Sequence, residues 1–545
     1  MAGQSGHPLD EEHSSKAPSP LRFAGALQIE MLTKTQPDEI QDYLSDASYL
    51  RGGNAARLVF PENIEEVASL LADATSTKTP VTISGAGTGT VAGRVPFGGS
   101  VIATDKLNRI HEIVREDHGG RVTAEAGVIL GDLQRAVTAK GLLYPPDPTE
   151  RGCFIGGNIA TNASGSRTFK YGPTRNYVER LRIALASGDT IDLRRGEVFA
   201  DPSGRISVPT SAGKSIEAQL PTYRMPNVRK HASGYYVAPG MDVIDLFIGS
   251  EGTLGVILEA ELRLLPEPEG LLSGVVFFDS EENLLAFVRE ARERSLTNRG
   301  TGPIAHERSS DRGISPTVRE GSRIDARALE FFDEESLNFL RQKYDTVPAS
   351  ATGAVFFEQE TTPANEDVLM NEWLELMNGH QALADESWFA TNEQDQIKLR
   401  EFRHALPVLM NEWFARFRQR KVSTDMSVPD EEFAGMLRFY QDALRGGDLR
   451  YTIFGHIGDN HVHVNILPRD DRESEKAWTI YHTFIRRAID AGGTISAEHG
   501  IGKLKREYLR ELYGDEHLRE MAALKKAFDP AGILGRGNMF AEEFL

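Results

Sequence analysis

The segment Ser84-Gly-Ala-Gly-Thr-Gly-Thr-Val-Ala-Gly93 directly follows Pro80-Val-Thr-Ile-Ser84, an apolar run typical of a short strand. Glycines let backbone N–H groups approach a phosphate closely, and a row of such groups favours anions. Two common nucleotide-binding loops are excluded. A dinucleotide-binding Rossmann loop needs glycine where Thr90 stands, and a Walker loop needs a lysine, which this segment lacks. The segment therefore predicts an anion-binding loop of another kind, with an ordinary turn as the alternative.

Three further segments give this loop more weight. Tyr144-Pro-Pro-Asp-Pro-Thr149 is a rigid extended element, because each proline fixes its own backbone angle. Ile155-Gly-Gly-Asn-Ile-Ala-Thr-Asn-Ala-Ser-Gly165 combines small residues with Asn and Thr, which suits a backbone lying against a large planar ligand. Gly249-Ser-Glu-Gly-Thr-Leu-Gly255 is another glycine-rich loop. Each of these segments taken alone would be interpreted as a tight turn.

The chain of 545 residues is too long for one hydrophobic core, so we expect two or three domains. Residues 178–193 predict a hairpin, residues 194–229 an irregular excursion, and Pro266-Glu-Pro-Glu-Gly270 a linker. Before the linker the pattern predicts helices at 61–71 and 130–140 and strands at 100–104 and 121–125. After the linker it predicts strands at 274–278 and 354–358, and helices at 282–293, 366–377 and 478–491, which indicates an α+β domain.

Composition excludes several classes of function. The formal net charge of −19 argues against nucleic acid and anionic lipid as general partners. The single cysteine, Cys153, excludes intrachain disulfides and a cluster held by four thiolates of this chain. We expect a reducing cytoplasm, because the first twenty residues lack the pattern of a secretory signal. No apolar run is long enough for a transmembrane segment.

A second informative segment is Phe454-Gly-His-Ile-Gly-Asp-Asn-His-Val-His-Val-Asn465. In a strand, its alternation places His461, His463 and Asn465 on one face, with valines and an isoleucine on the other. His456 precedes a Gly-Asp-Asn turn that can fold it back toward that face.

Further along the chain, Ser496-Ala-Glu-His-Gly-Ile-Gly-Lys503 adds Glu498 and His499. Two imidazoles and one carboxylate are typical of a catalytic divalent-metal site that keeps an open position. The sequence therefore predicts metal binding by His456, His463 and Glu498, with a histidine-rich polar strand as the alternative.

A local basic segment stands out against the acidic background. Arg416-Phe-Arg-Gln-Arg-Lys421 follows Arg400 and Arg403 within a short distance. These cations could receive an anionic substrate, although a solvated helix face explains most of them.

Taken in this order, the glycine-rich segments resemble the FAD-binding domain of the vanillyl-alcohol oxidase/p-cresol methylhydroxylase (PCMH) superfamily. The C-terminal motifs resemble the FAD-linked D-2-hydroxyacid dehydrogenases, which include D-lactate dehydrogenases, glycolate oxidase flavoprotein subunits and D-2-hydroxyglutarate dehydrogenases. The resemblance runs from about residue 50 to the end. It implies an α+β fold, with a two-subdomain PCMH-type FAD-binding domain and a C-terminal α+β cap built on an antiparallel sheet. The expected boundaries are 1–45 for a polar lead-in and first helix, 46–268 for FAD binding, 269–510 for the cap, and 511–545 for a segment returning to the FAD domain.

The resemblance also assigns the cofactor-binding residues. The pyrophosphate would lie on the first loop and the isoalloxazine and ribityl on the next two segments, while the third loop would reach the ribose and adenine. The residues implied are Ser84, Gly85, Ala86, Gly87, Thr88 and Gly89; Pro146, Asp147, Gly156, Gly157, Asn158, Thr161 and Gly165; and Glu251, Gly252 and Ile257, with Asn538 returning to the flavin.

In the cap, the resemblance implies that His456, His463 and Glu498 hold a divalent metal, zinc first, with manganese or iron as alternatives. It makes His499 the catalytic base, Asn465 a substrate contact and Arg400 the partner of the substrate carboxylate. The reaction implied is oxidation of a small D-2-hydroxy acid such as D-lactate to the 2-oxo acid, with hydride passing to flavin N5.

Electrons would leave to an acceptor other than oxygen: a quinone, a cytochrome, an electron-transfer flavoprotein or a partner subunit. A cytoplasmic protein peripheral at the inner membrane fits that role, and the oligomeric state stays open. The alternatives are a D-2-hydroxyglutarate or glycolate dehydrogenase, a redox-neutral flavin synthase of the alkylglycerone-phosphate type, and a non-catalytic electron relay.

Two departures from the family pattern refine these expectations. Members with covalent flavin often carry histidine in the first loop, where this chain has Thr88 and Thr90, so we expect non-covalent FAD. Relatives acting on 2-hydroxyglutarate place threonine near His404 and lysine near Ser423. Their absence favours a monocarboxylic substrate, with Lys421 as the alternative partner of a second carboxylate.

Overall fold

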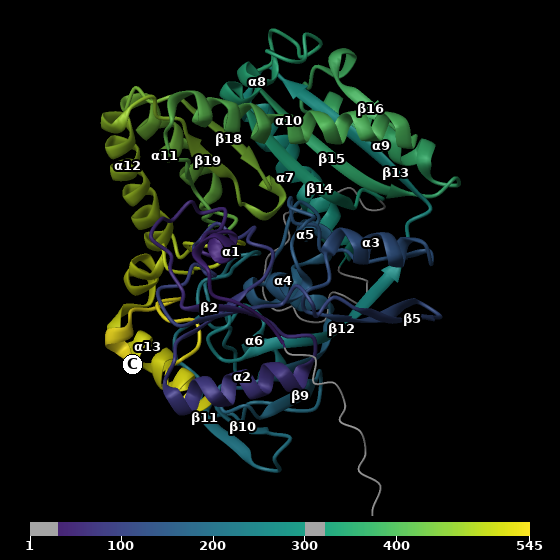
Figure 1. Ribbon diagram of the computed structural model, residues 1–545. Coiled ribbons are helices and arrows are strands. Elements are labelled where there is room, and N and C mark those ends of the chain that lie inside the picture. Colours follow the sequence, from purple (N-terminus) through teal and green to yellow (C-terminus); the bar gives the residue numbers. More distant parts are fainter. Residues whose placement is uncertain (1–30, 300–321) are drawn as a thin grey trace, which may run out of the picture.

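The computed structural model describes residues 31–299 and 322–545. Two lobes lie one above the other in Figure 1, the upper one built on a single large sheet and the lower one on two smaller sheets and a separate two-stranded hairpin. No helix in the described part of the chain is both long and apolar enough to span a bilayer.

The first sheet of the lower lobe has the order β1-β2-β4-β3, and β4 pairs in parallel with both β2 and β3. Its elements are β1 (Leu32–Lys34), the short helix α1 (Pro37–Ile40), β2 (Arg57–Phe60), α2 (Ile64–Thr77), β3 (Val81–Ser84) and β4 (Ser100–Ala103). The helix predicted at 61–71 is α2, which begins after Asn63, whose side chain accepts a hydrogen bond from the Glu66 N–H as an N-cap.

The second sheet has the order β5-β6-β12-β8-β9, and β7 pairs with β12. Its strands are β5 (Ile110–Glu116), β6 (Gly119–Glu125), β7 (Leu142–Leu143), β8 (Val178–Ala184), β9 (Thr190–Arg194) and β12 (Val256–Pro266). Antiparallel pairing of β8 with β9 confirms the predicted hairpin. The connecting helices are α3 (Leu130–Thr138), α4 (Ile155–Thr161), α5 (Thr168–Tyr171) and α6 (Ile244–Phe247).

The segment 194–229, predicted to be irregular, contains a regular hairpin of β10 (Arg205–Pro209) and β11 (Ser215–Gln219). Ile206 and Val208 are buried, while their strand neighbours face solvent. Only five residues alternate in each strand, too few for the pattern to be recognised against the polar background.

The upper lobe is the cap, and its sheet has the order β16-β13-β15-β14-β18-β19-β17 with antiparallel pairing throughout. The strands are β13 (Gly270–Phe278), β14 (Ala326–Asp333), β15 (Gly353–Thr361), β16 (Trp388–Ala390), β17 (Val422–Ser423), β18 (Tyr451–Gly455) and β19 (His463–Ile466). The helices are α7 (Glu281–Arg299), α8 (Glu334–Leu340), α9 (Glu366–Gly379), α10 (Glu393–Phe417), α11 (Phe433–Gly446) and α12 (Asp471–Asp490). The predicted antiparallel sheet with helices is confirmed.

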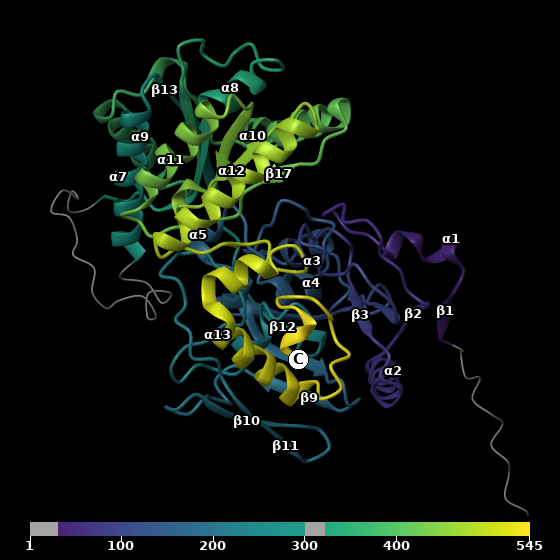
Figure 2. The same cartoon turned by 90° about the vertical axis from the view of Figure 1, so that its left-hand side faces the viewer.

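The chain then returns to the lower lobe, where α13 (Arg506–Phe528) lies against it in Figure 2. After α13, the Val81 N–H donates to the Ile533 carbonyl at 2.8 Å, which extends the edge of the first sheet. The buried Lys525 ammonium donates to the carbonyls of Thr253 and Leu534 and to Asp529. These bonds hold the C-terminal segment beside the glycine-rich loops.

Candidate functional site

The three glycine-rich segments line one groove in the lower lobe. Most of the residues predicted to bind the cofactor lie on it: Gly85, Ala86, Gly87, Thr88, Gly89, Gly156, Gly157, Asn158, Thr161, Glu251, Gly252, Ile257 and Asn538. Ser84, Pro146, Asp147 and Gly165 do not line it. Ser84 ends β3 just behind the loop, and a Cβ on Gly165 would lie 2.1 Å from the Asp147 carbonyl oxygen, so Gly165 permits the close packing of the 146–147 segment.

The first loop is backed by a cation. The Arg94 guanidinium donates to Ser84 Oγ at 3.0 Å and to the Gly85 carbonyl at 2.8 Å. Gly87 has φ +81°, and a Cβ there would lie 2.3 Å from this guanidinium. Glycine is therefore required at this position, and the positive charge behind the loop favours an anion in front of it.

Helix α4 presents a small, polar surface to the groove. A Cβ on Gly156 would lie 2.7 Å from the Ala126 side chain, whereas a Cβ on Gly157 would meet nothing within 4 Å. Asn158 lines the groove, and its Nδ2 is buried without a hydrogen-bond partner among the described residues. An open surface and an unsatisfied amide donor fit a large polar ligand such as FAD.

Asp46 is a groove residue that sequence analysis missed. Its carboxylate lines the groove, and Oδ2 has no hydrogen-bond partner within the described chain. Burial raises the pKa of this group. No local signal marks Asp46, because it stands in an ordinary polar stretch far from the glycine-rich motifs.

Glu251 and Asn538 tie the groove to the C-terminal segment. The Glu251 carboxylate accepts from the N–H groups of Ile501 and Gly502, both at 2.6 Å, and burial raises its pKa to about 7. Asn538 Nδ2 donates to the Gly93 carbonyl at 3.0 Å and to the Glu251 carbonyl at 3.2 Å. The predicted contact of Glu251 with ribose or adenine stays a prediction, and the structure shows this carboxylate bound to backbone amides.

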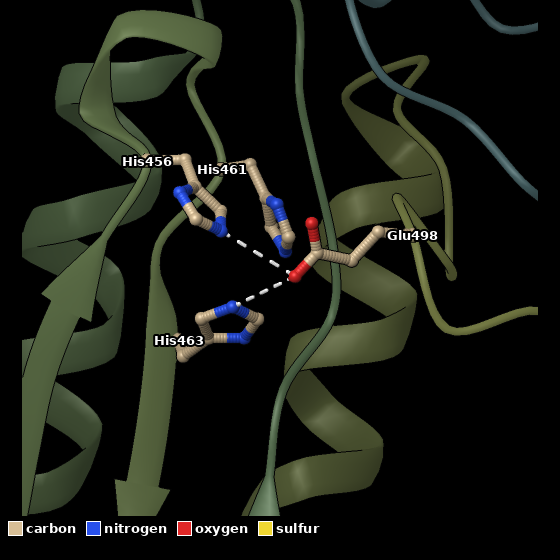
Figure 3. A group of neighbouring side chains, drawn as sticks. All are labelled: His456, His461, His463 and Glu498. Carbon is tan, nitrogen blue, oxygen red and sulfur yellow. Dashed lines mark ion pairs between the residues drawn. The ribbon is translucent and has the colours of Figure 1, made fainter. Parts of the chain in front are cut away.

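The predicted metal ligands converge in the cap. Figure 3 shows the rings of His456, His461 and His463 gathered around the Glu498 carboxylate. Glu498 Oε1 lies 3.4 Å from His456 Nε2 and 3.3 Å from His463 Nε2. Two ligands each about 2.0–2.1 Å from a tetrahedral zinc stand roughly 3.3 Å apart, so these separations fit a shared ion. One ligand atom from each of the four residues lies within 4.8 Å of the others.

The far nitrogens of two imidazoles are held by acceptors. His456 Nδ1 lies 2.6 Å from Glu330 Oε1, and His463 Nδ1 lies 3.0 Å from the Thr424 carbonyl oxygen. Arg403 in turn donates to Glu330 through Nε and Nη2, at 3.1 and 3.0 Å. Such partners fix the tautomer and leave each Nε2 lone pair for the centre, as in many metal sites.

Glu498 is held by the lower lobe. Its Oε2 accepts from Lys230 Nζ at 3.0 Å and from Ser164 Oγ at 3.2 Å. Burial disfavours the carboxylate, but Lys230 and His456 outweigh it and place the pKa of Glu498 well below its usual range. The group His456, His461, His463 and Glu498, here called the ligand cluster, therefore lies where the two lobes meet. The negatively charged Glu498 carboxylate lies at its centre.

His499 links the cluster to the groove. It lines the FAD groove, while its neighbour Glu498 belongs to the ligand cluster. Burial lowers the pKa of His499 to about 4, which keeps the imidazole neutral. Asp425 accepts from the backbone N–H groups of Glu498 and His499, both at 3.1 Å, and lies 3.4 Å from His499 Nδ1. This buried aspartate fixes both residues and leaves His499 Nε2 available.

The remaining predicted residues differ in their placement. Asn465 is buried on β19, and its Oδ1 has no hydrogen-bond partner among the described residues. Arg400 is half-buried on α10 and makes no hydrogen bond or ion pair within the described part of the chain. The structure brings Arg403, one turn further along α10, to Glu330 instead. Contact of Arg400 with a substrate stays a prediction.

Comparisons with known proteins show which family the chain belongs to. Residues 55–194 match the family model of an FAD binding domain, and residues 314–539 match that of the C-terminal domain of FAD linked oxidases. The glycolate oxidase subunit GlcD of Bacillus subtilis is 31% identical and covers 89% of each chain. A D-lactate dehydrogenase of Anaerostipes hadrus is 31% identical and covers 92% of this chain and 93% of its own.

A D-2-hydroxyglutarate dehydrogenase of Stutzerimonas stutzeri is 27% identical and covers 93% and 96% of the two chains. Among solved structures, an alkyldihydroxyacetonephosphate synthase superposes with a TM-score of 0.62 at 14% identity, covering 92% of this chain and 82% of that one. This likeness confirms the PCMH-type fold. The relatives and both family matches show that the chain belongs to the FAD-linked oxidoreductases, the family of FAD-linked hydroxyacid dehydrogenases in which these relatives are found.

Proposed function

We propose that the protein oxidises a D-2-hydroxy acid to the 2-oxo acid with non-covalent FAD, assisted by a divalent metal, zinc first, with manganese or iron as alternatives. The observation that carries this proposal is the adjacency of His499, which lines the flavin groove, and Glu498, which belongs to the ligand cluster. A substrate between them would touch both at once. The names of the relatives support the substrate class.

When bound, FAD would supply the two-electron acceptor, and the metal would polarise the oxygen atoms of the substrate. The neutral His499 would take the hydroxyl proton on Nε2, while Asp425 holds the other side of the ring. Asn465 would contact the substrate through its unsatisfied Oδ1. Arg400 would pair with the carboxylate, a role that suits a planar guanidinium.

Two other activities of the same class stay alternatives, namely a D-2-hydroxyglutarate dehydrogenase and a glycolate dehydrogenase. The redox-neutral synthase is less favoured, because the likeness to alkyldihydroxyacetonephosphate synthase at 14% identity supports the fold alone. A chain with one cysteine holds no thiolate cluster of its own, so electrons would leave the flavin to an external acceptor. A quinone, a cytochrome, an electron-transfer flavoprotein or a partner subunit could fill that role.

Anaerobic titration of the purified protein tests the proposal. D-2-hydroxy acids are expected to bleach the visible flavin absorbance and to yield the 2-oxo acid, whereas the L-enantiomers should leave the spectrum unchanged. The measurement is a visible spectrum during addition, followed by analysis of the product. Bleaching by L-acids alone, or by none of the acids, would exclude this function.

Acid precipitation of the yellow protein should release all of its flavin as FAD. No histidine is available in the first loop, and burial raises the pKa of the groove thiol Cys153 to about 11, so this thiol stays protonated and a poor nucleophile. Chromatography of the supernatant identifies the flavin, and Cys153→Ser should behave identically. Colour retained by the washed pellet would contradict the non-covalent assignment.

Substrate choice depends on the face of β17 and β19 beyond the metal ligands. Ser423 pairs with Asn465 across the two strands, so both side chains share the face of His463. The alternation of β17 continues to Lys421, which is exposed. The family pattern for a second carboxylate has a threonine near position 404 and a lysine near position 423. This chain has His404 and Ser423 there instead.

We therefore expect D-lactate to be preferred over D-2-hydroxyglutarate by a factor of roughly a hundred, since an unmatched buried carboxylate costs several kcal/mol. The measurement is kcat/KM for both acids with a dye acceptor, in the wild type and in Lys421→Met. The variant should keep the preference. A tenfold preference for the dicarboxylate in the wild type, about 1.4 kcal/mol, would contradict this expectation. If that preference disappears in Lys421→Met, Lys421 binds the second carboxylate.

A further inference from the structure

His461 lies inside the ligand cluster, although the sequence pattern assigned the metal to other residues. The turn η5 (Ile457–Asp459) is closed by the His461 N–H, which donates to the His456 carbonyl at 3.1 Å, and Asn460 adopts φ 53°. This reversal places the side chain beside its neighbours. Its ring centroid lies 5.3 Å from that of His456 and 4.5 Å from that of His463.

The imidazole of His461 is buried with its polar atoms unsatisfied. The side chain has no solvent exposure, and neither ring nitrogen makes a hydrogen bond of acceptable geometry with the described residues. The nearest acceptor is Asp425 Oδ1, 3.2 Å from Nε2. A buried polar group left without a partner destabilises the folded protein, so a ligand that engages this ring is expected.

Asp425 does not depend on His461 for its own hydrogen bonds. Its carboxylate already accepts from Ser496 Oγ and Lys505 Nζ, both at 2.6 Å, and from the two backbone N–H groups described above. Removing the imidazole would therefore leave this carboxylate satisfied. A purely structural role, in which His461 exists to neutralise Asp425, is not supported.

Each of the three histidines has an acceptor beside one ring nitrogen. His456 has a carboxylate behind its Nδ1, His463 has a carbonyl behind its Nδ1, and His461 has a carboxylate beside its Nε2. An acceptor behind the far nitrogen is typical of imidazoles that bind a metal through the near one. For His461 neither ring nitrogen has a hydrogen-bond partner within the described residues, so a nitrogen of this ring is free to bind an ion.

We propose that His461 is a further metal ligand through one of its ring nitrogens, so that the site comprises three imidazoles and the Glu498 carboxylate. This inference rests on the metal site of the proposed function and extends its ligand set. Four protein ligands close a tetrahedral zinc site. A hydroxy acid that adds two oxygens would require six-coordination, which manganese and iron accept more readily than zinc. This ligand set changes the order of the metals proposed above, because manganese and iron fit it together with a bound hydroxy acid better than zinc does.

The test compares the full-length, FAD-loaded wild type with His461→Phe, which keeps the bulk of the ring and removes both nitrogens. His482→Phe is the matched control, because His482 is an exposed histidine on α12. After chelation, affinities for Mn²⁺ and Co²⁺ are measured by competition with an indicator. The visible Co²⁺ spectrum and the metal-dependent rise in Tm are recorded in parallel, because a ligand that binds only the folded state raises Tm.

Loss of outer partners weakens metal binding about 10–100-fold, so loss of a ligand should exceed that range in His461→Phe. The Co²⁺ spectrum should change and the metal-dependent rise in Tm should largely disappear, while FAD content and the Tm of the metal-free protein stay close to the control. Affinity within threefold of the wild type and an unchanged Co²⁺ spectrum would overturn the proposal.

A fall in Tm that is equal with and without metal would also overturn it, because that result describes a packing role. If His461→Phe fails to retain FAD, the smaller His461→Ala is measured against the same two criteria. Failure of the wild type itself to bind either ion would instead refute the metal site of the proposed function, so the two failures are distinguishable.

Discussion

Replacement of His499 by alanine is expected to slow anaerobic flavin reduction by D-lactate about 10²–10⁴-fold, the usual contribution of a positioned acid or base. His499 is the residue that lines the groove beside Glu498, and Asp425 orients it from behind. Its neutral imidazole can accept a proton, which alanine cannot. The measurement is the single-turnover rate of flavin bleaching in a stopped-flow instrument.

The same variant should keep its FAD, because the loop backed by Arg94 and the α4 surface, which line the same groove, are unchanged by the substitution. His482→Ala, on the exposed side of α12, serves as the control and should reduce at the wild-type rate. A His499→Ala protein that retains FAD and is reduced within threefold of the wild type would remove His499 from the mechanism. That result would also favour the alternative of a non-catalytic flavoprotein that relays electrons and needs no base.

The groove could be predicted from sequence because its requirements are local. Gly87 needs a positive φ and space beside Arg94, and Gly156 must approach Ala126, so glycine itself is the signal. The β18–η5–β19 motif is also local, since His456 and His463 stand seven positions apart on a turn and a strand. Alternation with buried Val464 and Ile466 fixes the face that the histidines share.

The groups around the ligands could not be predicted, because they come from distant parts of the chain. Lys230 stands 268 residues before Glu498, and Glu330 stands 126 residues before His456. Neither lies in a recognisable motif, and Lys230 follows a segment interpreted as an irregular excursion. Single charged residues carry no pattern, so only the three-dimensional fold reveals them.

His461 shows a different limit of sequence analysis. The strand pattern placed it on the polar face, but the residue pattern and the family resemblance both assigned the metal to His456, His463 and Glu498. The structure places His461 within the same cluster because the turn before β19 doubles back. The sequence therefore predicted three of the four side chains that lie together here and left out one imidazole.

Glu498→Gln is expected to lose most of its bound metal while its FAD content stays near normal. The amide is nearly isosteric, and its oxygen can still accept from Lys230 and Ser164, so the junction of the lobes should remain intact. The variant lacks the anionic ligand that lies 3.3–3.4 Å from two imidazole nitrogens. Because even outer partners contribute about 10–100-fold to metal affinity, loss of this ligand should exceed that range.

Elemental analysis of the purified protein measures the metal, and absorbance measures the flavin. Glu507→Gln is the matched control, since Glu507 is exposed on α13 only nine positions further along the chain. His456→Ala should behave like Glu498→Gln, because each removes one ligand from the same ion. Turnover should fall together with metal content in both variants and recover in part when excess metal is added. Full metal content in both variants would show that other residues hold the ion. The role of His499 as a base would then have no support from a metal beside it.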